Sequence, residues 1–351
     1  MTGSKSPALV GLVGAWLAAA GAAGCRDTQA SSQAGAAAGG QAGEPAAAKA
    51  PRLAELRLDY ATYNASSVVL KRNGWLEQDL ARDGIAVRWV QSQGSNKANE
   101  MLASGAIDLA STAGAAALLA RTNGVPLKVV YVYAKPAWSG VVVGAGSPIG
   151  SLADLRGKKI AATRGTDPFF FLLRALHTAG LRQSDVELVH LQHADGRTAL
   201  QRRAVDAWAG LDPFMADAEL REHARVIYHN ADLNSFGTLN AREDFLAAQP
   251  ALVQRAIAQY ERARRWTLDH PAEAAGLLAA EAGLERDVAT RQLTERTVLD
   301  RDVGVPGAAL RTALAAVVPI LVDEHLVAPG ADPAKALDEL FAPGPARAVI
   351  P

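Results

Sequence analysis

The feature that most constrains the fold is an alternation of short apolar segments with longer helical ones, which runs through residues 56–228. Apolar runs such as residues 85–90 predict strands, and residues 67–82, with apolar side chains at helical spacing, predict a helix. A break at residues 134–140 divides the alternation into two series, and beyond Thr238 the pattern predicts helices only. Repeated strand–helix units of this kind predict an α/β protein with parallel strands covered by helices on both faces.

Residues 159–181 carry the clearest local signal, which is a strand, a glycine turn at Gly165 and an apolar helix. Thr166 or Asp167 is the expected helix N-cap, and Pro168 suits the first helical position because its missing N–H has no partner to lose. Free backbone N–H groups at the carboxyl end of a strand are where open α/β sheets bind ligands, and the helix dipole favours anions there. An ordinary capped turn has the same sequence pattern, so this stretch alone leaves both interpretations open.

Charge and cysteine content exclude several classes of function. The 351 residues contain 36 Lys plus Arg and 36 Asp plus Glu, so no overall basic field favours nucleic acid. Cys25 is the only cysteine, which excludes an internal disulfide and a cysteine-based zinc site. The histidines match no metal-binding spacing, and the chain has neither a G-x-S-x-G motif nor a phosphate-binding loop. We therefore expect no metal and no cofactor.

The N-terminal segment has the composition of an export signal. Residues 1–24 combine an early lysine with an apolar run of small residues, which predicts a signal peptide. Cys25 follows directly and resembles the lipidated cysteine of bacterial lipoproteins, with plain secretory cleavage as the alternative. Residues 25–52, rich in alanine and glycine, predict a flexible tether. We expect a periplasmic protein that is lipid-anchored to the cell envelope.

Four segments carry a family resemblance. They occur in order at residues 105–112, 152–161, 205–209 and 212–214. In this order and spacing they resemble the substrate-binding proteins of ABC importers for aliphatic sulfonates, taurine and nitrate, and the likeness covers residues 56–326.

The resemblance implies a two-lobed periplasmic binding protein of type II, with parallel-rich sheets flanked by helices and a hinged interlobe cleft. Lobe one would comprise residues 53–135 and 238–351, and lobe two residues 136–237. Such a protein is a monomer and no enzyme. It would capture a small organosulfonate in the cleft and deliver it to the membrane permease of the importer.

The resemblance also implies a set of ligand-binding residues from strand-to-helix connections and from the crossover between the lobes. Hydroxyl and N–H groups at helix starts suit sulfonate oxygens, although several of these side chains are equally good helix caps. The expected residues are Tyr63, Asn64, Ser111, Thr112, Gly114, Trp138, Gly165, Thr166, Asp167 and Asp212.

Asp167 departs from the serine-rich turn of sulfonate binders. A carboxylate facing the cleft would repel an anion, so Asp167 either caps its own helix, holds its loop in shape or meets a ligand that carries a cation or a donor, as taurine and amino-pyrimidines do. Alternative ligands are therefore nitrate and a pyrimidine or thiamin precursor. The architecture also resembles enzymes that synthesise the thiamin pyrimidine, but their cysteine-rich motif is absent. The cluster at His193 and Asp195 is interpreted as a helix cap.

Overall fold

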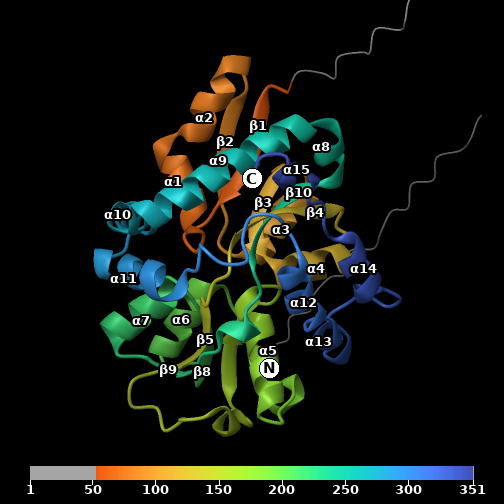
Figure 1. Cartoon of the computed structure of the whole chain (residues 1–351). Coiled ribbons are helices and arrows are strands. Elements are labelled where there is room, and N and C mark those ends of the chain that lie inside the picture. The colour runs from red at the N-terminus through yellow and green to blue at the C-terminus, as the bar shows by residue number, and fades with distance from the viewer. Residues whose placement is uncertain (1–52, 351) are drawn as a thin grey trace, which may run out of the picture. The chain divides into compact units, whose positions relative to one another are not determined.

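The computed structural model describes residues 53–350 and contains two five-stranded sheets with helices packed against them (Figure 1). The expected signal peptide, Cys25 and the tether of residues 25–52 lie outside the described residues. The strand order is β2-β1-β3-β10-β4 in the first sheet and β7-β6-β8-β5-β9 in the second. The α/β class expected from the alternating pattern is confirmed, and each sheet is mixed rather than purely parallel.

The first sheet gathers its parallel strands on one side. β1 pairs in parallel with β2 and β3, whereas β10 runs antiparallel to both β3 and β4. Since the carboxyl ends of parallel strands meet at one edge, the connections that follow β1, β2 and β3 lie together at that edge. The strands are β1 Glu55–Tyr60, β2 Ala86–Gln91, β3 Leu109–Ala113, β4 Leu127–Ala134 and β10 Gly237–Arg242.

The second sheet repeats this arrangement. β6 pairs in parallel with β7 and β8, and β5 runs antiparallel to β8 and β9. The connections after β6, β7 and β8 therefore share one edge as well. The strands are β5 Ser139–Val143, β6 Lys159–Ala162, β7 Glu187–His190, β8 Ala207–Leu211 and β9 Arg225–Tyr228.

The prediction that only helices follow Thr238 is wrong, because β10 occupies an interior position of the first sheet. Its sequence hides this role, since Thr238 and Asn240 are polar and yet fully buried. Their side chains meet Thr112 on β3, where Asn240 Nδ2 donates to Thr112 Oγ1 at 2.7 Å. A cross-strand partner thus accepts hydrogen bonds from Asn240 Nδ2 and the Thr238 hydroxyl, two donors that a sequence pattern assigns to the surface.

One predicted helix of the first half is divided. Residues 67–82 were expected to form a single helix, but α1 ends at Gly74, whose left-handed backbone (φ 64°) closes the helix through its N–H to Lys71 O. Residues 111–114 also have the sequence pattern of a helix start, but α4 begins only at Gly114, because Ser111 and Thr112 belong to β3. The helices are α1 Ala65–Asn73, α2 Trp75–Leu80, η1 Ala81–Asp83, α3 Ser95–Ala103 and α4 Gly114–Thr122.

The helices of the second sheet follow the predicted order. α5 starts at Asp167 and Thr166 occupies the N-cap position, as predicted, whereas Pro168 is the second helical residue and not the first. The helices are η2 Leu152–Leu155, α5 Asp167–Thr178, η3 Gln183–Asp185, α6 His193–Gln201, α7 Phe214–Glu222 and η4 Ala231–Leu233.

The C-terminal helices pack on elements of both sheets. α9 lies against α1 and β4, whereas α11 lies against α7, which follows a strand of the second sheet. The sequence pattern of residues 307–324 predicts one continuous helix, but the structure divides it, because Pro319 is the second residue of a new helix. The elements are α8 Glu243–Ala248, α9 Pro250–Asp269, α10 Pro271–Ala282, α11 Arg286–Arg291, the π-helical η5 Gln292–Arg296, α12 Ala308–Ala315, α13 Val318–Asp323, α14 Pro333–Glu339 and α15 Gly344–Arg347.

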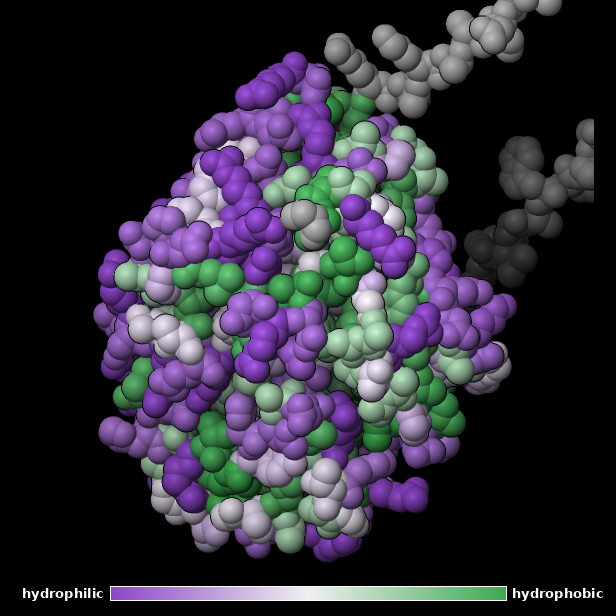
Figure 2. All heavy atoms as spheres, viewed as in Figure 1, coloured by the Kyte–Doolittle hydropathy of each residue, from purple (hydrophilic) through white to green (hydrophobic). Residues whose placement is uncertain are grey.

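Large apolar side chains are buried almost throughout the described residues. Tyr131, Trp208 and the triplet of phenylalanines that opens α5 are among the largest fully buried side chains. Within residues 53–350 only Leu268 and Val322 are large apolar side chains that stand exposed. Hydrophilic and apolar residues are interspersed over the face of the molecule shown in Figure 2. A search of residues 53–350 for a helix with the length and apolar character of a membrane span finds none.

Candidate functional site

A cavity of about 280 Å³ lies where connections from both sheets meet. Two of these connections follow β1 and β2 of the first sheet, and two follow β7 and β8 of the second. All four are strand-to-helix connections, so the cavity sits at the carboxyl edges where α/β sheets bind ligands. The lining residues are Thr62, Tyr63, Gln91, Ser92, Gln93, Gln192, His193, Ala194, Asp195, Leu211, Asp212 and Phe214.

On the first-sheet side, Tyr63 lines the cavity and rests on a buried polar network. Its hydroxyl donates to Ser111 O at 3.1 Å and lies 3.4 Å from Ser92 Oγ. Ser92 Oγ in turn donates to Asp59 Oδ2 at 2.7 Å. Burial raises the pKa of Asp59 to about 6, although three hydrogen bonds from serines stabilise its charged form. This network fixes the position of the Tyr63 ring.

Ser111 contributes to the same network rather than to the cavity wall. Its N–H donates to Asp59 Oδ1 at 2.6 Å, and its hydroxyl donates to Asp59 Oδ2 at 3.1 Å. Thr112 faces β10, from which Asn240 Nδ2 donates to its hydroxyl oxygen at 2.7 Å, and the hydroxyl itself donates to Ala113 O of β3 at 3.1 Å. Both side chains are fully buried, and neither is among the lining residues. The structure thus places them behind the cavity.

Asn64 and Gly114 stand at helix starts, as expected, and the Asn64 side-chain oxygen and the Gly114 N–H have protein partners, whereas Asn64 Nδ2 has none among residues 53–350. Asn64 Oδ1 accepts from Ser67 N at 3.2 Å and caps α1. Gly114 N donates to Phe236 O at 2.7 Å, in the segment that leads into β10. The first N–H groups of α4 therefore meet the protein's own chain instead of the cavity.

Gly165, Thr166 and Asp167 lie in the turn between β6 and α5, outside the cavity lining. Gly165 has a positive φ of 76°, a conformation that glycine adopts without strain. The Thr166 hydroxyl donates to Thr163 O at 2.6 Å. A β-carbon at Gly165 would lie 3.6 Å from the Asn96 side chain, so α3 covers this turn.

Asp167 ties two connections between the sheets to the start of α5. Its Oδ2 accepts from Trp138 Nε1 at 2.6 Å, and its Oδ1 accepts from Ser235 Oγ at 2.6 Å. Ser235 N lies 3.0 Å from Oδ2. Trp138 follows β4 and Ser235 precedes β10, so one carboxylate joins both crossover segments. Burial raises the pKa of Asp167, while the donors from Ser235 and Trp138 oppose that shift.

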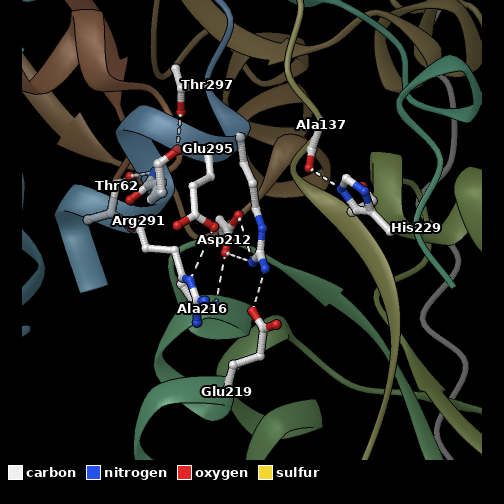
Figure 3. Close-up of polar contacts among 12 residues, drawn as sticks. Thr62, Ala137, Asp212, Ala216, Glu219, His229, Arg291, Glu295 and Thr297 are labelled. Atoms are coloured by element: carbon white, nitrogen blue, oxygen red, sulfur yellow. Dashed lines mark hydrogen bonds and ion pairs between the residues drawn. The ribbon is translucent and has the colours of Figure 1, made fainter. Parts of the chain in front are cut away.

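Asp212 lines the cavity and forms a buried ion pair (Figure 3). Its Oδ1 accepts from Arg296 Nη1 at 3.0 Å and from Ala216 N at 2.9 Å. Arg296 lies at the end of η5 and also pairs with Glu219 on α7. Burial raises the pKa of Asp212 to about 6, and the Arg296 guanidinium opposes this shift. The C-terminal segment is thereby fastened to the second sheet beside the cavity.

The first turn of α6 forms a cavity wall that the sequence interpretation did not assign to the site. Gln192 holds the N-cap position, and His193, Ala194 and Asp195 follow. The first N–H groups of an α-helix have no intrahelical acceptor, so this turn offers donors to an anion. The prediction that Asp195 caps α6 is wrong, because Asp195 lies inside the first turn.

Of the expected site residues, Tyr63 and Asp212 line the cavity, and the other eight lie behind it or beside it. The residues that were not expected come mainly from the connections after β2 and β7. Their one sequence signal is position, because each directly follows a predicted strand. The cavity as a whole combines amides, hydroxyls, N–H groups and the carboxylates of Asp195 and Asp212 with the Phe214 and Tyr63 rings, which suits a small polar molecule with an apolar part.

Comparison with known proteins places these features in a family. The family described as NMT1/THI5 like matches residues 62–274. A protein of Escherichia coli (strain K12) that is named for binding aliphatic sulfonates is 34% identical over 248 residues, which cover 69% of this chain and 76% of that protein.

Two solved structures share the fold. The alkanesulfonate-binding protein SsuA from Xanthomonas axonopodis pv. citri, bound to MOPS, gives a TM-score of 0.75 at 27% identity and covers 82% of this chain and 99% of that one. The periplasmic aliphatic sulphonate binding protein SsuA from Escherichia coli gives a TM-score of 0.71 at 28% identity, with 83% and 92% covered. The expected periplasmic binding protein fold is confirmed, and the chain belongs to the NMT1/THI5-like family as a relative of the aliphatic sulfonate-binding proteins.

Proposed function

We propose that this protein is the solute-binding component of an ABC importer and captures a small aliphatic sulfonate in the cavity between the two sheets. The observation that carries the proposal is that connections from both sheets line one cavity in a chain related to sulfonate-binding proteins. The N–H groups at the start of α6 supply donors for sulfonate oxygens, and Phe214 and Tyr63 supply apolar surface for the alkyl part.

The two sheets correspond to two lobes in this proposal. Lobe one comprises residues 53–135 and 238–351, and lobe two comprises residues 136–237. A ligand held between lobes stabilises the closed arrangement by its contacts to both, and its affinity is reduced by whatever closure costs. The pairing of Arg296 with Asp212 supports a closed arrangement, since it joins the C-terminal segment to the second sheet.

The cellular setting follows from the same proposal. The protein acts in the periplasm as a monomer, Cys25 carries a lipid anchor, and the tether of residues 25–52 lets the lobes reach the membrane permease. The periplasmic location named for the Escherichia coli structure supports this setting. The signal peptide, Cys25 and the tether all lie outside the described residues.

Within the sulfonates, we propose either a plain alkanesulfonate or a taurine-like aminosulfonate as the ligand. Nitrate is not favoured, because the nitrate-binding structure among the neighbours is only 13% identical and shares the fold alone. The related proteins are binding proteins, and this supports ligand capture without turnover.

A thermal-shift screen followed by calorimetry tests the proposal. The purified protein should be stabilised by alkanesulfonates, with one ligand bound per chain and the ligand recovered unchanged. Nitrate, sulfate and aminopyrimidines are the comparison ligands. A clear response to one of these and none to any sulfonate would overturn the sulfonate assignment and leave a binding protein for another solute.

A further inference from the structure

His193 begins α6 at the cavity, and its buried imidazole lies between parts of both sheets. Nδ1 lies 3.2 Å from the hydroxyl of Thr163, which directly follows β6. Nε2 faces Gly94 in the connection between β2 and α3, since a β-carbon at Gly94 would lie 3.2 Å from it. Among residues 53–350, Nε2 has no hydrogen-bond partner. A polar atom of a residue that lines the cavity is thus held, unsatisfied, where connections from the two sheets meet.

Thr163 determines which nitrogen of the His193 ring carries the hydrogen. The Thr163 hydroxyl donates its single hydrogen to Leu191 O at 2.7 Å, because a carbonyl oxygen can only accept. Thr163 Oγ1 can therefore only accept from His193, so the hydrogen of the neutral ring is on Nδ1. Nε2 is then a bare acceptor. Burial lowers the pKa of His193 to about 3, so the ring is neutral at pH 7.

Two other buried acceptors, one beside His193 in the sequence and one near Gly94, also lack partners among residues 53–350. Gln192 Oε1, from the residue before His193, is also a buried acceptor without a partner among the described side chains and backbone. Asn96 Oδ1 is likewise buried and has no hydrogen-bond partner within residues 53–350. It would lie 2.9 Å from a β-carbon at Gly94. Leaving a buried acceptor unpaired is unfavourable, so a bound molecule that donates a hydrogen bond here gains affinity.

We propose that His193 Nε2 accepts a hydrogen bond from the ligand, so that the protein selects a sulfonate bearing an ammonium or hydroxyl group over the unsubstituted alkyl analogue. This inference rests on the proposed function and specifies its ligand. Sulfonate oxygens can only accept hydrogen bonds, so they require the donors elsewhere in the cavity. His193 Nε2 accepts from the ammonium or hydroxyl group at the other end of the same molecule. Thr163 is a positioning residue, because it acts through the tautomer of His193.

Calorimetry on the full chain at pH 7.5 tests the selection with three sulfonates that share the same two-carbon chain. These are 2-aminoethanesulfonate, 2-hydroxyethanesulfonate and ethanesulfonate. The two ligands with donors should bind at least roughly tenfold more tightly than ethanesulfonate, as expected for one buried hydrogen bond. His193→Phe keeps a ring without the acceptor, and the affinity ratio between the ligands should fall to about one.

Thr163 provides the matched pair of variants and a readout independent of ligand. Thr163→Ser keeps the hydroxyl and should keep both the ratio and the nitrogen NMR signature of hydrogen on Nδ1. Thr163→Val removes the acceptor for Nδ1, so both the affinity ratio and the NMR signature should be lost. If His193→Phe does not fold, Thr163→Val tests the inference in its place.

Three results would overturn the inference. Equal affinity of the wild type for the three ligands would overturn it while leaving the proposed function intact. An NMR signature of hydrogen on Nε2 in the wild type would do the same. Failure of every sulfonate to bind would overturn the proposed function and this inference together.

Discussion

Replacing Asp167 by asparagine is expected to destabilise the protein and to weaken every sulfonate ligand to a similar degree. The carboxylate receives only donors, from Trp138 Nε1, Ser235 Oγ and Ser235 N. An amide has one accepting oxygen, so when that oxygen receives Trp138 Nε1 and Ser235 N, the NH₂ group faces Ser235 Oγ, and the Ser235 hydroxyl loses the acceptor for its hydrogen. Losing one hydrogen bond to a buried charged group costs about 1.5–3 kcal/mol in the free energy of unfolding.

Urea denaturation followed by circular dichroism measures this loss, and calorimetry measures the affinity. Asp154→Asn is the matched control, because Asp154 also accepts three donors, from Gly150 and Ser151, but does so at the surface. Its loss should be clearly smaller. Unchanged stability of Asp167→Asn together with a loss of affinity for aminosulfonates alone would refute the reasoning, since it would mean that Asp167 contacts the ligand.

Two further substitutions probe the ion pair and the start of β10. Arg296→Met should lower the free energy of unfolding by about 3 kcal/mol at pH 7, the low end for a broken buried pair, because Glu219 is partly exposed. Gly237→Ala should lower it by about 1–3 kcal/mol, because the new methyl would lie 2.6 Å from Cζ of the Tyr133 ring. The Arg296 result has a defined pH dependence. Burial raises the pKa of Asp212 to about 6 even though the Arg296 guanidinium opposes the shift, so without Arg296 the pKa is higher still, and protonation of Asp212 in the folded state removes the unpaired charge as the pH falls. The deficit of Arg296→Met relative to the wild type should therefore shrink between pH 7 and pH 5 in thermal unfolding. A deficit that grows over this range would contradict the account. For Gly237→Ala the control is Gly144→Ala, where no heavy atom lies within 4 Å, and equal losses in both would be contradictory.

The strand–helix alternation and the start of α5 were predictable from sequence because local physics determines them. Apolar runs form strands, and Pro168 fits the first turn of α5. β10 was not predictable, because its buried Thr238 and Asn240 depend on Thr112, which lies far away in the sequence. The end of α1 at Gly74 has a visible signal in the sequence, the glycine itself. It was not predicted because helices also tolerate an isolated glycine.

The site was predictable in its general location and less so in its residues. The sequence indicated strand-to-helix connections, and Tyr63 and Asp212 lie on the cavity as expected. Ser111 and Asp167 have the right chemistry for a ligand, but buried partners occupy them in the fold. The sequence pattern assigns His193 to a helix start. Its burial and its contact with Thr163 depend on the tertiary fold and could not be predicted from the local sequence.

The central claim is that the ligand binds in the cavity between the two sheets, and blocking that cavity tests it most directly. Ala194 lines the cavity and is exposed, so Ala194→Trp should fill the space, whereas Ala145→Trp places the same ring at an exposed site elsewhere. Titration calorimetry with ethanesulfonate and 2-aminoethanesulfonate should show binding to the wild type and to Ala145→Trp, and at least a hundredfold weaker binding to Ala194→Trp, about 2.7 kcal/mol. Undiminished affinity of a correctly folded Ala194→Trp variant would contradict the account.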